Sequence, residues 1–477
     1  MSLPTTVLGT ILRKRCPRLL STGVGGTSHY LRSTDSGQYR RPIRSFSKTS
    51  DSKKSSASLS KQVELPKTEI FGDFKGLVTD FPCMLNNPST GPEPVYDEIV
   101  SGYQVYRNSE PFHMHFSNGL LPATKIAYET WGELNAAKDN AVLIFTGLSG
   151  SSHARSHEGS PAPGWWEKFI GPGCAVDTNK FFVICANHLG GCYGSSGPSS
   201  RNPVTGKPYA TSFPVTSVID MVKFQFQLLD HLGIDKLYAA VGSSLGGMCS
   251  LAAGCLYPER VNCIVSISGA ARSHPTSIAL RYLQRRTIMS DPNWKKGYYY
   301  GDKYPRMGMK IAREIATISY RSGPEWNQRF ARKKINPDTD PSLCPTFLIE
   351  SYIDYQGESF CMKYDPNSLL YISKAMDLFD LSDGYSSLAE GMSVIRCPVL
   401  VIGVQSDILF PIHQQREIAS TLKNAGNKSV TYFELDSIYG HDTFLLDLNG
   451  VGAGVKGFLE TDLSEVHKPV KPRNQSS

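Results

Sequence analysis

The chain has 477 residues, with 50 lysines and arginines against 43 aspartates and glutamates, which gives a formal net charge of +7. Hydrophobic residues make up 40% of the sequence, an ordinary fraction for a globular protein. No stretch approaches the roughly 20 consecutive apolar residues that a membrane-spanning helix requires. The composition therefore predicts a folded protein without a membrane span.

The N-terminal segment differs in composition from the rest of the chain. It is rich in arginine, serine and threonine, and Asp35 is the only acidic residue before Asp51. Residues 6–20 can form an amphipathic helix, which is typical of a mitochondrial presequence. A disordered basic tail is the alternative. We expect a mitochondrial transit peptide and a location in the matrix. Because much of the positive charge lies in this segment, the folded part is not predicted to bind nucleic acid.

The next informative feature is an apolar, strand-like stretch at 237–241 that leads directly into a Gly-x-Ser-x-Gly motif centred on Ser244. A serine on a sharp turn from strand to helix needs small residues two positions before and after it, and Gly242 and Gly246 meet that need. The small apolar residues of 248–256 suit a buried helix. The pattern predicts a nucleophile elbow, although a lone motif of this kind is often an ordinary turn.

A nucleophile of this type is followed along the chain by an acid and then a histidine. Asp407 lies just after a buried-strand pattern at 398–404, and His441 lies on a glycine-bearing loop after a second strand pattern at 430–435. We predict that Ser244, Asp407 and His441 form a catalytic triad. Three further acids remain alternatives to Asp407, namely Asp436, Asp442 and Asp447.

The tetrahedral intermediate formed at such a serine needs backbone N–H donors for its oxyanion. The residue after the nucleophile, Leu245, supplies one donor in this arrangement. The apolar run 141–145 predicts another buried strand, and Leu148 in the glycine-containing loop after it is the natural second donor. A plain glycine-rich connection is the alternative for that loop.

A metal site is not predicted. His153 and His157 have a spacing that places two ligands on one face of a helix, but the serines and glycines around them favour a loop. The eleven cysteines are scattered singly and never form a Cys-x-x-Cys pair.

Several longer segments resemble the signature regions of the homoserine O-acetyltransferase family and its serine O-acyltransferase relatives. These segments are 121–135, 187–200, 350–357 and 440–442. The resemblance implies an α/β-hydrolase fold with a mostly parallel central sheet and an inserted helical lid. It also implies a ping-pong reaction in which acyl-CoA is a substrate and no bound cofactor is needed. Relatives of this kind are often dimers through the lid, so a homodimer is expected.

Composition sets the two ends of the chain apart, and the region from 273 to 395 breaks the alternation of strand and helix patterns. We therefore expect five parts, namely a transit peptide or disordered arm (1–60), the first part of the hydrolase core (61–272), the lid (273–395), the second part of the core (396–467) and a polar tail (468–477).

The resemblance also implies residues that bind an amino-acid acceptor. Arg313 matches the family's arginine at the active-site tunnel and would bind the acceptor carboxylate, and Asp442 would bind its ammonium group. Tyr320, in the family's tyrosine position, would add a hydroxyl contact. From the residues alone, Arg313 is more simply explained as part of a solvated helix face.

Two departures from the homoserine pattern favour L-serine as the acceptor, with L-homoserine as the alternative. Leu245 replaces the methionine that usually follows the nucleophile, and the segment 273–281 is similar to the serine-acylating branch. A one-methylene difference is worth only about 1–3 kcal/mol in a pocket, so strict discrimination does not follow. We favour succinyl-CoA over acetyl-CoA as donor. Its extra carboxylate could meet one of four arginines, Arg281, Arg285, Arg286 or Arg321.

Two other classes of function remain. An esterase would use the same triad with water as the acceptor and would not need CoA, but Arg313 and Asp442 suit a zwitterion better than a lipid. A catalytically silent binding protein is disfavoured by the intact set of serine, aspartate and histidine.

Overall fold

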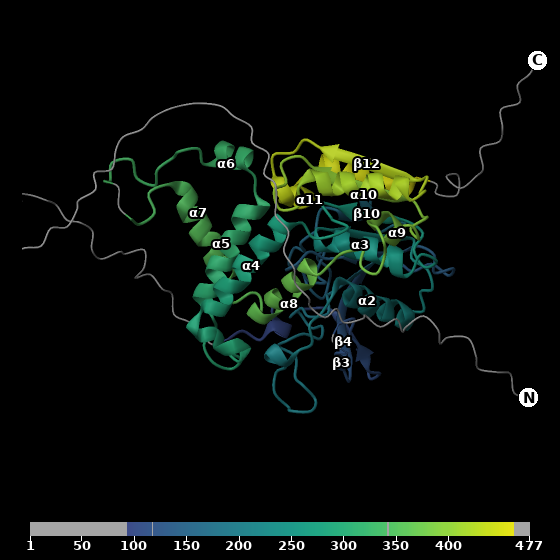
Figure 1. Ribbon diagram of the computed structural model, residues 1–477, viewed down its shortest axis with the longest axis horizontal. Helices are drawn as coiled ribbons and strands as arrows, with labels where there is room; N and C mark the ends of the chain where they lie inside the picture. The colour runs from purple at the N-terminus through teal and green to yellow at the C-terminus, as the bar shows by residue number, and fades with distance from the viewer. Residues whose placement is uncertain (1–92, 117, 341–342, 462–477) are drawn as a thin grey trace, which may run out of the picture. The chain divides into compact units, whose positions relative to one another are not determined.

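The computed structural model describes residues 93–116, 118–340 and 343–461 (Figure 1). All of them belong to one unit, 76–477. The predicted transit peptide and polar tail lie outside the described residues. None of the described helices is both long enough and apolar enough to cross a membrane.

The centre of the fold is an eight-stranded sheet. Its first two pairings are antiparallel and the remaining five are parallel, which confirms the prediction of a mostly parallel sheet. In spatial order the strands are β1 (Gln104–Asn108), β4 (Thr124–Trp131), β8 (Phe182–Ala186), β5 (Ala141–Phe145), β9 (Ala239–Ser243), β10 (Ile264–Ile267), β11 (Val399–Val404) and β12 (Val430–Leu435).

The parallel inner strands are mostly apolar because helices cover both faces of the sheet. Every residue of β5 is buried, and alternate side chains enter different hydrophobic clusters. Leu143 packs in the cluster that contains residues of α2 (Val218–Leu232), α3 (Leu245–Leu256) and α10 (Ile412–Asn424). Val142 packs in the cluster that contains residues of α12 (Ala453–Glu460).

Between β10 and β11 the alternation of strand and helix gives way to a group of helices, most of which lie to the left of the sheet in Figure 1. They are α4 (Pro275–Ser290), α5 (Arg306–Tyr320), α6 (Gly323–Arg329), α7 (Leu348–Phe360), α8 (Pro366–Asp377) and α9 (Leu388–Gly391). Here we call α4 to α8 the lid helices. The start of α8 follows from its sequence, since Asp365 caps the helix through the N–H of Ser368 and a proline occupies the first helical position.

Short elements complete the described chain. Two small ladders pair β2 (Phe112–His113) with β3 (Leu120–Leu121) and β6 (Ile170–Gly171) with β7 (Val176–Asp177). Short helical segments are η1 (Tyr96–Glu98), η2 (Ala210–Ser212), η3 (Pro292–Gly297), η4 (Gly440–Asp442), α11 (Thr443–Leu446) and η5 (Leu448–Gly452).

The turn from β9 to α3 brings backbone segments into very close contact. Ser244 has φ 59° and ψ −121°, a backbone conformation that residues other than glycine rarely adopt. A Cβ atom added to Gly242 would lie 2.0 Å from the carbonyl oxygen of Gly246, and one added to Gly246 would lie 2.1 Å from that of Phe145. The motif therefore needs glycine at both positions for steric reasons.

We expect Gly242→Ala to destabilise the protein by roughly 3 kcal/mol, because the new methyl group meets backbone that cannot rotate away. Thermal unfolding followed by circular dichroism measures the change. Gly457→Ala is the matched control, since nothing lies within 4 Å of a Cβ at that position of α12. Equal melting temperatures for the two variants would contradict the steric explanation.

Candidate active site

The structure brings Ser244, Asp407 and His441 together, although they are far apart in the sequence. Each follows the carboxyl end of a parallel strand: β9, β11 and β12, respectively. The Oγ of Ser244 lies 2.8 Å from Nε2 of His441, and Nδ1 of His441 lies 2.6 Å from Oδ2 of Asp407. All three residues are buried. The arrangement can activate the serine, since His441 can accept the hydroxyl proton while Asp407 holds the imidazole by its other nitrogen.

Backbone N–H groups of its own loop hold the carboxylate of Asp407 in place. Its other oxygen, Oδ1, accepts the backbone N–H groups of Leu409 and Phe410 at 2.9 and 2.8 Å. The ring of Phe410 stacks on the imidazole of His441 with 4.9 Å between the centroids. The alternative acids are placed elsewhere: Asp436 is exposed, and Asp447 accepts the N–H of Gly450.

Asp407→Asn tests this assignment. We expect kcat to fall about 10⁴-fold with little change in KM, because an amide would favour the wrong tautomer of His441. Steady-state release of product measures it. Asp436→Asn removes an exposed acid that precedes the same histidine in the sequence and should keep wild-type activity. A large loss in that control, with activity retained in Asp407→Asn, would move the acid to another residue.

A cavity of about 320 Å³ opens onto Ser244 and His441. Its walls come from the loop after β5 and from four lid helices, α4, α5, α7 and α8. The lid thus covers the serine.

The cavity also contains the three residues expected to bind an acceptor, Arg313, Tyr320 and Asp442. The guanidinium of Arg313 lies between two aromatic rings, 4.4 Å from the centroid of Phe360 and 5.0 Å from that of Tyr320. Among the residues that the structure describes, the Arg313 side chain has no ion-pair or hydrogen-bond partner. It can therefore bind an incoming carboxylate.

Asp442 is already partly engaged. Its Oδ2 lies 3.2 Å from Nη2 of Arg321, a pairing that the sequence pattern did not indicate. Burial raises the pKa of the Asp442 carboxyl, and the positive charge of Arg321 opposes that rise. Arg321 also binds Glu325, so Asp442 belongs to a chain of charges between the C-terminus of α5 and the N-terminus of α6.

The loop after β5 runs beside the serine, and Gly147 and Leu148 line the same cavity as Ser244. The carbonyl of Leu148 accepts a hydrogen bond from Tyr364 at 2.9 Å, which ties this loop to the lid. Leu245 begins α3 directly after the serine. The assignment of the two N–H groups as oxyanion donors stays a prediction.

A buried histidine that sequence reasoning missed fixes the start of this loop. His188, after β8, lies with Nε2 2.9 Å from the carbonyl oxygen of Thr146 and with Nδ1 3.2 Å from Nε2 of Gln225. The amide of Gln225 can donate to Nδ1, so Nε2 carries the proton and donates to Thr146. Burial lowers the pKa of His188 to about 4.

The lowered pKa of His188 predicts a pH dependence of stability. Between pH 4 and 6.5 the unfolded chain binds a proton at this residue that the folded chain does not, so stability falls as the pH falls through that window. The loss reaches roughly 3 kcal/mol near pH 4. Urea unfolding at several pH values measures it, and His188→Gln should show a flatter profile than the wild type across the same window. Parallel profiles would contradict the assignment.

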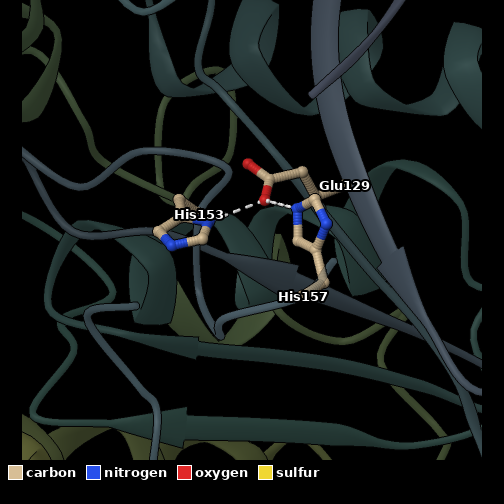
Figure 2. A group of neighbouring side chains, drawn as sticks. All are labelled: Glu129, His153 and His157. Carbon is tan, nitrogen blue, oxygen red and sulfur yellow. Dashed lines mark hydrogen bonds and ion pairs between the residues drawn. The ribbon is translucent and has the colours of Figure 1, made fainter. Parts of the chain in front are cut away.

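A second buried cluster joins β4 to the loop that follows Leu148 (Figure 2). Oε2 of Glu129 lies 2.8 Å from Nδ1 of His153 and 2.7 Å from Nε2 of His157, and Oε1 accepts the hydroxyl of Ser152 at 2.8 Å. The three residues Glu129, His153 and His157 are of types that could hold a metal ion.

The hydrogen bonds of the two rings favour an ion pair over a metal site. Nε2 of His153 lies 2.7 Å from the carbonyl oxygen of Ala162, so both nitrogens face acceptors and both carry protons. Nδ1 of His157 accepts the N–H of Gly159, which leaves the proton on Nε2, where a metal ion would need a lone pair. Burial lowers the pKa of His153, but the bonds to Glu129 and Ala162 outweigh it and the net pKa is raised. We therefore interpret the cluster as a buried ion pair that anchors the loop.

Comparison with known proteins agrees with this geometry. A family model described as alpha/beta hydrolase fold matches residues 140–452. A serine O-succinyltransferase from Emericella nidulans is 52% identical over 434 residues, which covers 78% of this chain and 83% of that protein. A homoserine O-acetyltransferase from Moorella thermoacetica is 44% identical over 359 residues, covering 75% of this chain and 96% of that protein.

Solved structures give a similar result. Homoserine O-acetyltransferase from Bacillus anthracis has a TM-score of 0.70 at 28% identity, covering 76% of this chain and 98% of that one. Esterase E22 has a TM-score of 0.69 at 30% identity, covering 76% of this chain and 100% of that one. The chain belongs to the α/β-hydrolase fold family and, within it, to the acyltransferase family that contains the serine O-succinyltransferases and homoserine O-acetyltransferases.

Proposed function

We propose that the protein is an L-serine O-acyltransferase that moves a succinyl group from succinyl-CoA to the serine hydroxyl. One observation carries the proposal. The hydrogen-bonded set of Ser244, His441 and Asp407 opens into a lid-covered cavity that also holds the carboxylate of Asp442 and the side chain of Arg313, which has no acidic partner in the described part of the chain. The triad and the proposed site for a zwitterion therefore share one cavity.

In the first half-reaction His441 accepts the proton of Ser244 through Nε2 as Oγ attacks the thioester carbonyl. The N–H groups of Leu148 and Leu245 stabilise the oxyanion. The C–S bond then breaks, the proton passes from His441 to the leaving sulfur, and CoA departs as the free thiol. The product is an ester of Ser244.

In the second half-reaction the acceptor hydroxyl replaces water. Its carboxylate binds Arg313, its ammonium group faces Asp442, and Tyr320 adds a hydroxyl contact. His441 accepts the hydroxyl proton as the oxygen attacks the acyl-enzyme. Collapse of the intermediate returns the proton to Oγ of Ser244 and releases the O-acyl amino acid. This product has an activated leaving group that sulfide can displace, as in cysteine synthesis.

The alternative acceptor is L-homoserine, which would make the protein a homoserine O-acetyltransferase of methionine synthesis. The similarity to the Moorella thermoacetica enzyme supports it. We favour serine because Leu245 and the segment 273–281 depart from the homoserine pattern. Hydrolysis is the third possibility, and the similarity to esterase E22 supports it, but an unpaired guanidinium in the cavity suits a charged acceptor better.

We also propose that the protein acts in the mitochondrial matrix after removal of an N-terminal transit peptide, that it needs no bound cofactor or metal, and that it is a homodimer. The basic, serine-rich composition of 1–60 supports the location.

Free thiol release from succinyl-CoA or acetyl-CoA, with L-serine or L-homoserine as acceptor, tests the proposal on the purified full chain. We expect the fastest release with succinyl-CoA and serine, and a loss of about 10⁴-fold or more in Ser244→Ala. Release with homoserine alone would assign the protein to the alternative, and release that is independent of any acceptor would make it a hydrolase.

A further inference from the structure

The cavity has a second cationic region, formed by α4. Arg281 and Gln284 lie one turn apart on this helix, and both line the cavity that contains Ser244. Arg281 is only 3% exposed and Gln284 5%. A buried arginine beside a reactive serine needs a reason, because burying a positive charge is costly unless it is fully paired.

The pairing of Arg281 is incomplete. Its Nε donates to Oδ1 of Asp377 at 2.6 Å, and its Nη2 donates to Oγ of Ser273 at 2.9 Å. Arg285 donates to the other oxygen of Asp377, so two buried arginines share one carboxylate. Within residues 93–116, 118–340 and 343–461, Nη1 of Arg281 is buried and has no hydrogen-bond partner. The local charge is therefore one positive unit in excess, and one strong donor is unused.

The other three arginines that were candidates to bind the donor's carboxylate either use their terminal nitrogens in hydrogen bonds and ion pairs or are exposed. Arg285 uses both terminal nitrogens, on Ser373 and Asp377. Arg321 binds Glu325 and Asp442, and Arg286 lies on the exposed side of α4. Arg321 also lines the cavity and has a buried Nε without a partner, but both of its terminal nitrogens are engaged by acids. Among the described residues, Arg281 is therefore the one of the four arginines that combines a place in the cavity wall with a buried terminal nitrogen that has no partner.

We infer that Arg281, assisted by the amide of Gln284, binds the terminal carboxylate of the donor's acyl group and so determines the preference for a dicarboxylic acyl-CoA. The inference rests on the proposed function and specifies its donor. Two carboxylates pass through the cavity in that reaction, one on the acyl group and one on the acceptor. Three guanidinium groups line the cavity, and because Arg321 is paired with Glu325 and Asp442, Arg281 on α4 and Arg313 on α5 are the two that can match them. An acetyl group has nothing to place against Arg281.

Removal of Arg281 should be tolerated by the fold. After Arg281→Met, Asp377 still binds Arg285, so the buried charges become one pair in place of two cations and one anion. Losing the surplus cation leaves no buried charge without a partner.

The experiment measures acylation of Ser244 without an acceptor. The full chain is mixed with succinyl-CoA, butyryl-CoA or acetyl-CoA, and the burst of free CoA and the mass of the acyl-enzyme are recorded. Butyryl-CoA has the four-carbon chain of succinyl-CoA but lacks its carboxylate. The wild type should acylate faster with succinyl-CoA, and Arg281→Met should lower that rate about 10- to 100-fold without a comparable loss for butyryl-CoA, as expected for a charge-assisted hydrogen bond. Arg286→Met, on the same helix but exposed, is the matched control and should behave as the wild type.

Arg281→Lys provides a second variant that keeps a cation opposite Asp377 but lacks the guanidinium fork. We expect an intermediate loss of the preference for succinyl-CoA over butyryl-CoA. Should the methionine variant fail to fold, Arg281→Lys and Gln284→Leu test the role of Arg281, each through the ratio of the acylation rates with succinyl-CoA and butyryl-CoA.

The outcomes separate this inference from the proposed function. A uniform loss with all three donors, or an unchanged ratio in folded variants, overturns the role of Arg281 and leaves the proposed function standing. A wild-type protein with no preference for succinyl-CoA over butyryl-CoA overturns the inference as well. A wild-type protein that forms no acyl-enzyme overturns both. An acyl-enzyme with the expected ratios that does not acylate serine supports the inference and contradicts only the acceptor.

Discussion

The active site depends on one close backbone contact, where the carbonyl of Phe145 at the end of β5 approaches the α-carbon of Gly246 at the start of α3. This contact joins two segments that a side chain would push apart. One segment continues into Leu148, and the other carries Ser244 and Leu245. Because β5 and β9 are neighbours in the sheet, the nucleophile and both expected oxyanion donors belong to one rigid unit. The strained φ of Ser244 persists because the closely packed backbone on both sides of the turn holds it in this conformation.

The loop after β5 is then held at three points by groups that take no part in the chemistry. His188 binds the carbonyl of Thr146, Tyr364 binds that of Leu148, and the carboxylate of Glu129 binds the segment from Ser152 to His157. Tyr364 comes from the chain that leads into lid helix α8. The geometry of the loop after β5 is therefore coupled to the position of the lid helices.

Much of this arrangement could be predicted from the sequence because its signals are local. Buried strands such as 141–145 and 430–435 are apolar or alternating runs, and the structure places β5 and β12 at those residues. The run 237–241 predicted a strand two residues too early. β9 occupies Ala239–Ser243 because its pairing with β5 extends through Gly242, although glycine has a low intrinsic preference for strands.

The remaining features depend on contacts between distant residues, which no local pattern encodes. Glu129 meets His153 only because β4 and the loop after β5 lie side by side, and an acid in a mostly apolar strand was the single available signal. The pairing of Asp442 with Arg321 likewise arises from the meeting of α5 with the turn that carries His441. Sequence order alone selected Asp407 over Asp442, and the geometry gives the physical reason: Asp407 faces Nδ1 of the histidine, whereas Asp442 faces an arginine.

The distribution of charge in the cavity explains how a hydrolase-like fold can favour transfer over hydrolysis. Water and an amino acid compete for the same acyl-enzyme, and both need His441 as base. In the proposed reaction only the amino acid gains binding energy from Arg313 and Asp442, and that energy would hold its hydroxyl in line with the ester carbon. The lid helices that supply Arg313 also cover the serine, so the cation proposed to bind the acceptor carboxylate and the walls that limit water come from the same segment of chain, whereas Asp442 comes from η4. In the proposed reaction, specificity for transfer therefore depends on the lid together with Asp442, and the triad can remain the one that hydrolases use.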